Sequence, residues 1–383
     1  MKKNIIFLMA ALLILGVGSA AHAFPFPYTD VRALGMGGAY VAGGSGISAV
    51  NYNPALLAKG GHLELVVPVA TVRVDDHIGI QDKLDSIDAL LGGQDLATWA
   101  AGASSADLAA MDNLIISLDQ PGKNSVDAEV YGGAAVALKA FGLMVGVGYS
   151  DLIDASVITA MDTSNISTAA DYLNNSSTLE FKGIDARQLV FSAAREFSGF
   201  TLGANLRQIN GSSYFNTVSA FNNSGNIDLD TLKQSEHDYT ATALDVGFLT
   251  SLTPLVDVGI VARDLVAPKA EFFDGSTYEP DTRYRAGVSI NMALLHVVGD
   301  FDLSTTESFS GAKFREMAVG AELALPVLKL RGGFSKNMAL DGAPEVLHLG
   351  VGFSLLAVKI DLGGAFDTDS RNMVAGASLR FKL

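Results

Sequence analysis

A chain of 383 residues that has no cysteine cannot form a redox-active cysteine pair, a thiolate metal site or a disulfide. Its formal net charge of −15 argues against nucleic-acid binding, which needs a basic face. Nearly half of the residues, 49%, are hydrophobic, yet beyond residue 18 no run of 18 apolar residues could form a spanning helix. The spacing of the apolar residues therefore decides the class of protein.

The first 23 residues have the pattern of a cleavable signal peptide. Met1-Lys2-Lys3 is positively charged, residues 5–17 are apolar, and Ala21-His22-Ala23 fits the cleavage pattern. Because the apolar run is short for a bilayer-spanning helix, we favour export over the alternative of an N-terminal membrane anchor. We expect the mature chain to begin near Ala23 and Phe24.

Residues 24–61 form a glycine-rich segment that suits neither a helix nor a regular strand. Scattered apolar residues favour a folded segment over the alternative, a disordered tail. Asn51 and Asn53 offer side-chain amides for hydrogen bonding, and Pro54, followed by Ala55, fixes a turn.

The long connection after the first predicted strand has apolar residues at helical spacing, on either side of Gly92-Gly93. We predict a helical insertion over residues 82–118, with Ser105 as the cap of its second helix. Its candidate contacts for a ligand or a partner protein are Leu84, Ile87, Leu91, Trp99 and Met111. The alternative is that these helices pack only on each other and on the barrel.

Residues 62–383 contain about fourteen segments in which apolar residues alternate with polar or small ones. Alternation at period two predicts β-strands with one apolar and one polar face. The predicted strands cover residues 62–74, 126–138, 141–150, 184–196, 200–208, 239–250, 255–264, 282–291, 294–303, 314–324, 327–335, 345–355, 357–366 and 372–383.

Short turns and long polar loops alternate between these strands, which is typical of bacterial outer-membrane barrels and has no basis in a soluble sandwich. Arg283 and Arg285 alternate with apolar neighbours, and an arginine that faces lipid costs about 2–4 kcal/mol. We therefore expect the charged series to face the lumen; the alternative is the solvated face of a soluble sheet. The prediction is an all-β fold: a transmembrane antiparallel β-barrel of about 14 strands, with residues 24–61 as an N-terminal hatch in its lumen.

Two stretches of the glycine-rich segment, "RALGMGGAYVA" and "SAVNYNPALLA", resemble the hatch of the fatty-acid-transporter (FadL) superfamily of outer-membrane barrels. The Asn-Pro-Ala motif lies at Asn53, Pro54 and Ala55. Within that superfamily, "PFPYTDVRALGMGG" and "VVPVATVRVDD" are most similar to the proteins labelled conjugal transfer TraF. The resemblance implies a 14-stranded barrel plugged by a hatch. It carries over no fatty-acid-binding residue, because no motif here matches those of the family.

Signals for catalysis and metal binding are weak. The glycines of residues 35–47 match neither the dinucleotide-binding pattern nor the nucleophile-elbow pattern. Asn226, Asp228 and Asp230 mimic a calcium loop, but Thr231 stands where that loop needs glycine. We predict no enzyme activity, no cofactor and no metal site.

The resemblance leaves two functions open. The first is an outer-membrane protein that binds or passes hydrophobic small molecules, with outer-membrane lipid and such a molecule as its partners and no nucleic acid. The alternative is a barrel-anchored surface component of conjugation or secretion machinery, with proteins of that machinery as partners. A conduit predicts an apolar pocket beside the hatch and a lateral gap between strands, whereas an anchor predicts a sealed lumen.

Overall fold

The fold is given by a computed structural model, which describes residues 28–120, 124–164, 166, 168–220, 234–308, 311–340, 342–367 and 372–382. The predicted signal peptide, the first residues of the glycine-rich segment, the calcium-like residues 226–231 and Leu383 lie outside the described residues.

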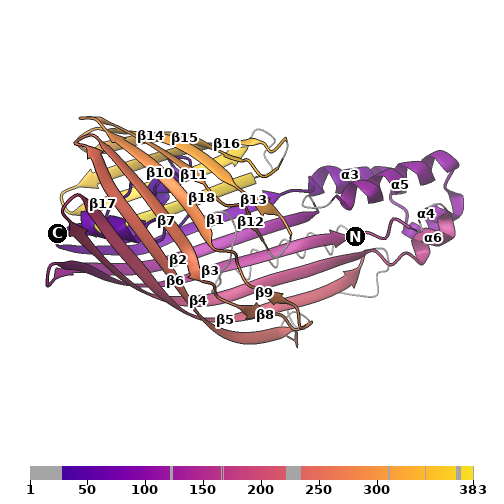
Figure 1. Cartoon of the computed structure of the whole chain (residues 1–383). Coiled ribbons are helices and arrows are strands. Elements are labelled where there is room, and N and C mark those ends of the chain that lie inside the picture. The colour runs from indigo at the N-terminus through magenta and orange to yellow at the C-terminus, as the bar shows by residue number, and fades with distance from the viewer. Residues whose placement is uncertain are drawn as a thin grey trace.

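Fourteen antiparallel strands form one closed barrel, in which β1 pairs with both β2 and β18 (Figure 1). The barrel prediction is confirmed in class and in strand number. The strands are β1 (Leu63–Asp76), β2 (Ser125–Ala140), β3 (Leu143–Ala160), β4 (Thr178–Phe197), β5 (Phe200–Ser219), β6 (Glu236–Thr253), β7 (Val256–Val266), β10 (Arg283–Asn291), β11 (Leu295–Asp302), β14 (Glu316–Ala324), β15 (Leu328–Asn337), β16 (Glu345–Leu355), β17 (Val358–Asp367) and β18 (Asn372–Lys382).

The two ends of the barrel differ in their connections. Turns of two or three residues join β2 to β3, β4 to β5, β6 to β7, β10 to β11, β14 to β15 and β16 to β17, all at one end. We call this the short-turn end, and the opposite end, where the other connections lie, the long-loop end. The tight β2–β3 turn places Phe141 and Gly142 at positive φ, a conformation for which glycine is the usual residue.

Four neighbouring strands are longer than the sequence predicted. β3, β4, β5 and β6 have 18, 20, 20 and 18 residues, whereas about 9–11 residues cross a bilayer. Gln208 and Asn210 of β5 face outward and are exposed and polar. The apolar band of the outer face therefore ends before Gln208 and does not reach the long-loop end of this strand. The prediction followed the apolar band and therefore stopped where the wall leaves the membrane.

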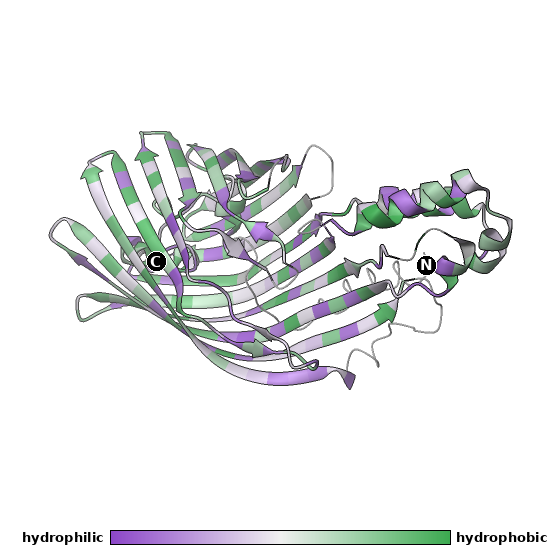
Figure 2. Cartoon of the chain, turned by 45° about the vertical axis from the view of Figure 1, so that its right-hand side comes forward, coloured by the Kyte–Doolittle hydropathy of each residue, from purple (hydrophilic) through white to green (hydrophobic). Residues whose placement is uncertain are grey.

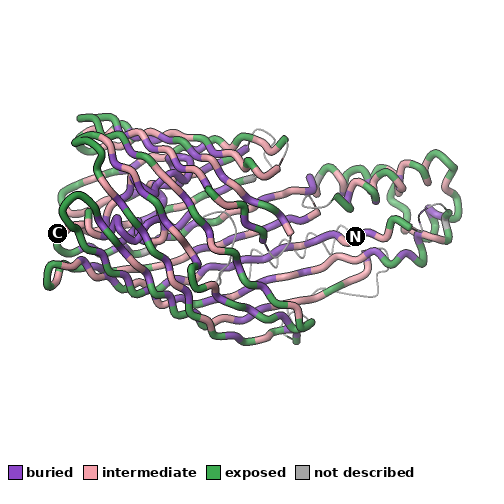
Figure 3. The backbone as a smooth tube through the Cα atoms, viewed as in Figure 1, coloured by how far each residue is buried: buried purple, intermediate pink, exposed green. Residues whose placement is uncertain are grey.

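The outer face of the wall is apolar and the inner face is polar. Arg285 is fully buried, with 0% of its surface exposed, whereas its neighbour Tyr284 is 42% exposed on the outer face. Hydrophobic residues alternate along the strands in Figure 2, and buried positions alternate with exposed ones in Figure 3. The predicted facing of the charged series toward the lumen agrees with this burial pattern.

Two small hairpins lie in the connections at the long-loop end: β8 (Ala270–Glu271) with β9 (Thr277–Tyr278), and β12 (Thr306–Glu307) with β13 (Lys313–Phe314). The Ser213 hydroxyl of β5 donates to the Glu271 carbonyl at 2.5 Å. The Tyr278 hydroxyl donates to the Glu307 carbonyl at 3.3 Å, so the two hairpins contact each other. They cover the inner face of the wall at this end.

The β1–β2 connection contains three helices, α3 (Ile80–Leu91), α4 (Leu96–Gly102) and α5 (Ser105–Leu118), where the sequence analysis anticipated two. The cap of α5 is Ser104 and not Ser105, because Asp107 completes a capping box with Ser104. The short helix α6 (Ala169–Leu173), from the β3–β4 connection, packs on α4 through Tyr172 and Trp99, whose rings lie 5.8 Å apart. Among the described residues, no helix has the length and hydropathy to cross a membrane.

Candidate functional site

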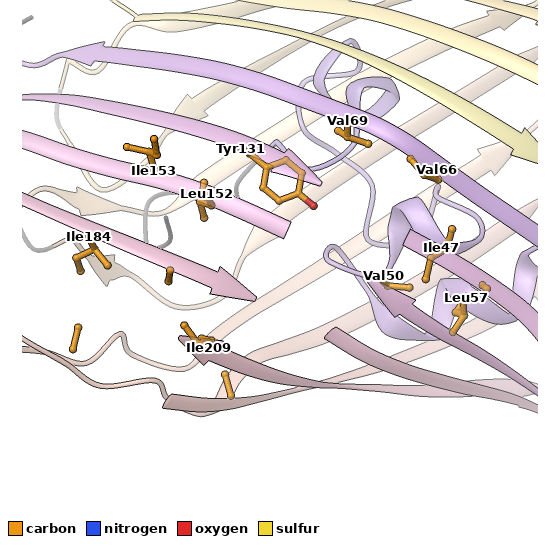
Figure 4. Close-up of a cluster of buried hydrophobic side chains, with 14 of the residues drawn as sticks. Ile47, Val50, Leu57, Val66, Val69, Tyr131, Leu152, Ile153, Ile184 and Ile209 are labelled. Atoms are coloured by element: carbon orange, nitrogen blue, oxygen red, sulfur yellow. The ribbon is translucent and has the colours of Figure 1, made fainter. Parts of the chain in front are cut away.

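Residues 28–61 lie inside the barrel, toward the short-turn end (Figure 1). The segment contains α2 (Val31–Leu34) and two 3-10 helices, η1 (Ile47–Ala49) and η2 (Pro54–Lys59). α2 packs against β16, β17 and β18, and η2 packs against β3, β4, β5 and β6. The close-up in Figure 4 shows Ile47, Val50 and Leu57 of the segment near Val66 and Val69 of β1.

Glycines in the wall make room for this segment. A Cβ added at Gly247 of β6 would lie 1.9 Å from Asn53 Oδ1, and one at Gly203 of β5 would lie 2.3 Å from the Pro54 carbonyl carbon. Contacts of this length are prohibitive, so the approach of the segment to the wall requires glycine. Further wall glycines whose added Cβ would come within 3.0 Å of the segment are Gly146, Gly259, Gly287, Gly320, Gly333, Gly350 and Gly363.

Asn53 is the most highly connected of the predicted hatch residues. Its amide nitrogen donates to the carbonyls of Val41 at 2.9 Å and of Phe248 at 3.1 Å. Its side-chain oxygen accepts from the Ala55 amide at 3.0 Å and so caps η2, which begins at Pro54. Asn53 therefore joins two parts of the segment to β6.

Asn51 makes a weaker contact. Its amide lies 3.4 Å from the Tyr131 hydroxyl, and its carbonyl accepts from Arg263 Nη1 at 3.2 Å. The four predicted residues Asn51, Asn53, Pro54 and Ala55 thus lie together where the segment contacts the wall.

A chain of ion pairs begins and ends on the segment, and its members are mostly buried. It runs from Arg32 to Glu322 (2.9 Å), to Arg331 (2.6 Å), to Asp361 (2.7 Å), to Arg380 (3.8 Å) and back to Asp30 (3.2 Å). Only Asp30 and Arg32 belong to the segment; the other four side chains are on β14, β15, β17 and β18. Sequence reasoning missed this chain because its members are far apart in the sequence.

Two wall carboxylates bind backbone amides of the segment. Asp300 Oδ2 accepts from the amides of Tyr40 at 2.7 Å and Val41 at 3.0 Å. Glu64 accepts from the amides of Ile47 at 2.9 Å and Gly61 at 2.8 Å. These bonds satisfy amides that the irregular backbone of the segment cannot pair with itself.

A small cavity of about 30 Å³ lies between the segment and β1–β4, lined among others by Ile47, Val50 and Val66. Next to it, the pairing of β1 shifts by one residue between Val66 and Val69, against both β18 and β2. Pro68 lies within this irregularity and has no amide hydrogen to donate. The pairing of β6 with β7, which also lies beside the segment, is irregular as well, between Leu244 and Val246 and between Ser251 and Thr253.

The helices of the β1–β2 connection enclose a larger apolar cavity of about 170 Å³. Leu84, Ile87, Leu91 and Met111 line it, together with the ends of β3 and β4. Trp99 is absent from the lining; it is buried against Tyr172. Four of the five candidate contact residues therefore share one cavity.

The lumen at the long-loop end holds a third cavity, of about 220 Å³, with a mixed lining that includes several charged side chains. Its wall includes Tyr28, Arg73, Asp75, His77 and Glu316. Apolar residues such as Phe314 and Val346 line it as well, so charged and apolar side chains share this cavity. Among the described residues, no group of three or more histidine or acidic side chains could hold a metal ion.

The closed barrel, its apolar outer face and the segment inside its lumen define a transmembrane β-barrel that holds its own N-terminal segment. A family model described as "F plasmid transfer operon, TraF, protein" matches residues 50–302, and the chain belongs to this family. A search of curated proteins gave no significant match.

Solved structures share the fold at low sequence identity. The Ralstonia pickettii toluene transporter TbuX matches with a TM-score of 0.55 at 14% identity, covering 94% of this chain and 100% of the transporter. The monoaromatic hydrocarbon channel CymD gives 0.58 at 12%, with 94% and 99% covered. A Pseudomonas aeruginosa FadL homologue gives 0.54 at 12%, with 94% and 100% covered. At such identities the likeness establishes the fold.

Proposed function

We propose that this protein is an outer-membrane barrel that binds hydrophobic small molecules and passes them across the membrane, with residues 28–61 as a displaceable hatch. The apolar cavity within α3–α5 carries the proposal. Its volume of about 170 Å³ is close to that of engineered apolar cavities of roughly 150 Å³, which bind benzene. The names of TbuX and CymD, a toluene transporter and a monoaromatic hydrocarbon channel, support the same class of cargo.

In this proposal the long-loop end faces the exterior and the helices capture the molecule there. The charged side chains in the lining of the third cavity, among them Arg73 and Asp75, disfavour a straight path through the lumen. An exit beside the β1 irregularity fits better, because the residues that line the neighbouring cavity include no charged one and the segment fills the adjacent space. The cavity holds only about 30 Å³, so passage requires movement of the segment.

The binding step is tested with toluene and the detergent-solubilised protein, by saturation-transfer NMR. Leu84→Trp places a large ring in the cavity, and we expect it to abolish the toluene signal. Ile116→Trp is the matched control, because Ile116 lies on α5 but is 51% exposed and does not line the cavity. Equal signals from the two variants would contradict capture by the helices. Mass spectrometry of a lipid extract from the purified protein would identify the natural ligand.

The second candidate is a barrel that anchors a surface component of conjugation machinery. The helices project well beyond the wall of the barrel in Figure 1, and they expose Ile116 and Leu173 to solvent. The description of the family also refers to a transfer operon. Loss of conjugation with Ile116→Asp, together with unchanged toluene binding, would favour this function.

A further inference from the structure

The outer face of the wall has a hollow of about 460 Å³ across β6, β7, β10, β11 and β14. We call it the lipid-facing hollow. Ala286 and Gly299 form its floor, and Phe248, Ile260, Phe301 and Met317 stand around it. Phe248 and Ile260 are exposed on the outer face, so the hollow opens to the surroundings of the barrel and not to the lumen.

Strand pairing explains the shape of the hollow. Ala286 pairs with Phe301 and Ile260, and Gly299 pairs with Val288 and Val319. Each of two adjacent rows of outward-facing side chains therefore contains one very small residue. The larger side chains on both sides of it project outward, and the space between them is the hollow. Such a recess, lined by apolar side chains at membrane depth, suits a hydrocarbon chain.

A cation lies at the end of the hollow nearest the long loops. The Arg315 guanidinium lies 4.9 Å from the centre of the Phe301 ring. Arg315 precedes Met317 by two residues, so both side chains are on the outer face, about 7 Å apart along the chain. Strand tilt of about 45° places Arg315 roughly 5 Å nearer to the membrane surface than the hollow.

The guanidinium is only partly used by the protein. Its Nε donates to the Asp302 carbonyl at 3.3 Å, and its two terminal nitrogens have no partner among the described residues. Arginine favours phosphate oxygens, to which it donates two hydrogen bonds at once. Tyr284, exposed on the outer face of β10, which β11 separates from β14, is an amphipathic side chain of the kind found where membrane meets water.

We infer that this hollow is a specific binding site for one phosphate-bearing lipid of the leaflet at the long-loop end. One acyl chain fills the recess over Ala286 and Gly299, and the phosphate group binds Arg315. The site is independent of the proposed passage of small molecules, because it lies on the other side of the wall from the segment. It would fix the depth of the barrel in the membrane at β10–β14.

The test is native mass spectrometry of the whole protein, released from a neutral detergent after titration with phosphatidylglycerol or with a diacylglycerol of the same chains. We expect one phosphatidylglycerol to be retained more tightly than the rest. Ala286→Phe should remove this tight binding of both lipids. Arg315→Gln should weaken the binding of phosphatidylglycerol about tenfold and leave diacylglycerol unchanged.

Two variants control for general effects of the substitutions. Ala321→Phe adds the same bulk on the outer face of β14, outside the hollow, and Arg195→Gln removes an outward arginine that lies 5.3 Å from Phe197 at the short-turn end. Both should bind as the parent does. Equal binding by Ala286→Phe and Ala321→Phe would mean ordinary surrounding lipid and overturn the site. An unchanged affinity for phosphatidylglycerol in Arg315→Gln would overturn the role of the phosphate group.

Discussion

A single methyl group at Gly247 should release the segment from the wall. The Cβ of Gly247→Ala would lie 1.9 Å from Asn53 Oδ1 and 2.9 Å from Pro54 Cδ, so Asn53 has to move. Asn53 then loses its bonds to Val41 and Phe248 and its cap on Ala55. At about 1 kcal/mol for each of three hydrogen bonds, the attached state loses about 3 kcal/mol. This corresponds to a rise of about a hundredfold in the population of the displaced segment.

Planar-bilayer recording measures the effect as the frequency of ion-conducting openings, because the lumen is lined by charged side chains. Gly332→Ala is the matched control: its added methyl group meets no atom within 4 Å, and it changes the strand backbone in the same way. Both variants should fold and insert with equal yield, because the wall keeps all of its strand pairing. If Gly247→Ala opens no more often than Gly332→Ala, the contacts of Asn53 do not keep the segment in the lumen and the reasoning fails.

The remaining predictions concern the segment, the last strand and one histidine. Deletion of residues 28–61 should leave a folded barrel that conducts ions continuously in the same bilayer assay; a silent barrel would mean that the segment is not a plug. Phe381→Asp should block assembly, as judged by heat-modifiable gel migration, whereas Lys382→Gln on the opposite face, which can still donate a hydrogen bond to Glu64, should assemble; equal outcomes would contradict the facing. Burial lowers the pKa of His77, but the hydrogen bond and charge of Asp127 at 3.0 Å outweigh it and hold that pKa above its usual value. Thermal stability from this pair should be complete below about pH 6.5, decline as the pH rises through the raised pKa, and show no such decline in His77→Gln.

The sequence was sufficient to predict the barrel, because each strand faces lipid on one side and the polar lumen on the other, so apolar and polar residues alternate along it. Arg285 and Asp300 could be assigned to the inner face from their apolar neighbours alone, since a charged side chain in lipid is costly. Strand ends were predictable only where the membrane band and the strand end together, as in β10 and β17. In β4 and β5 the hydrogen-bonded ladder continues into water, where no alternation of hydropathy marks it.

The contacts of the segment were less accessible to sequence reasoning. The inward glycines, such as Gly203 and Gly247, are visible as glycines in strands, but nothing local shows that a backbone approaches them. The partners of Arg32 and Asp30 lie about 290 and 350 residues away in the chain. Such pairs depend on barrel closure and on the position of the segment within it, and both are set by the whole fold.

Most of the wall charges that bind the segment also pair with another wall charge, and they would keep that partner if the segment moved away. If Asp30 and Arg32 move away, Glu322 keeps Arg331, and Asp361 keeps both Arg331 and Arg380. Glu64, which loses two backbone amides, keeps Lys382 at 3.3 Å. A buried charge left without its partner costs about 3–5 kcal/mol, and these six wall charges avoid that cost because they pair with one another. Asp300 and Asp257 are exceptions. Both backbone donors of Asp300 belong to the segment, and water entering the emptied lumen would have to replace them. Asp257 would lose Lys59 at 2.6 Å and keep only the neutral donors Ser251 and Asn291. A permanently fixed filler has no need for wall charges that are paired in its absence, so this arrangement favours a displaceable hatch over a sealed anchor.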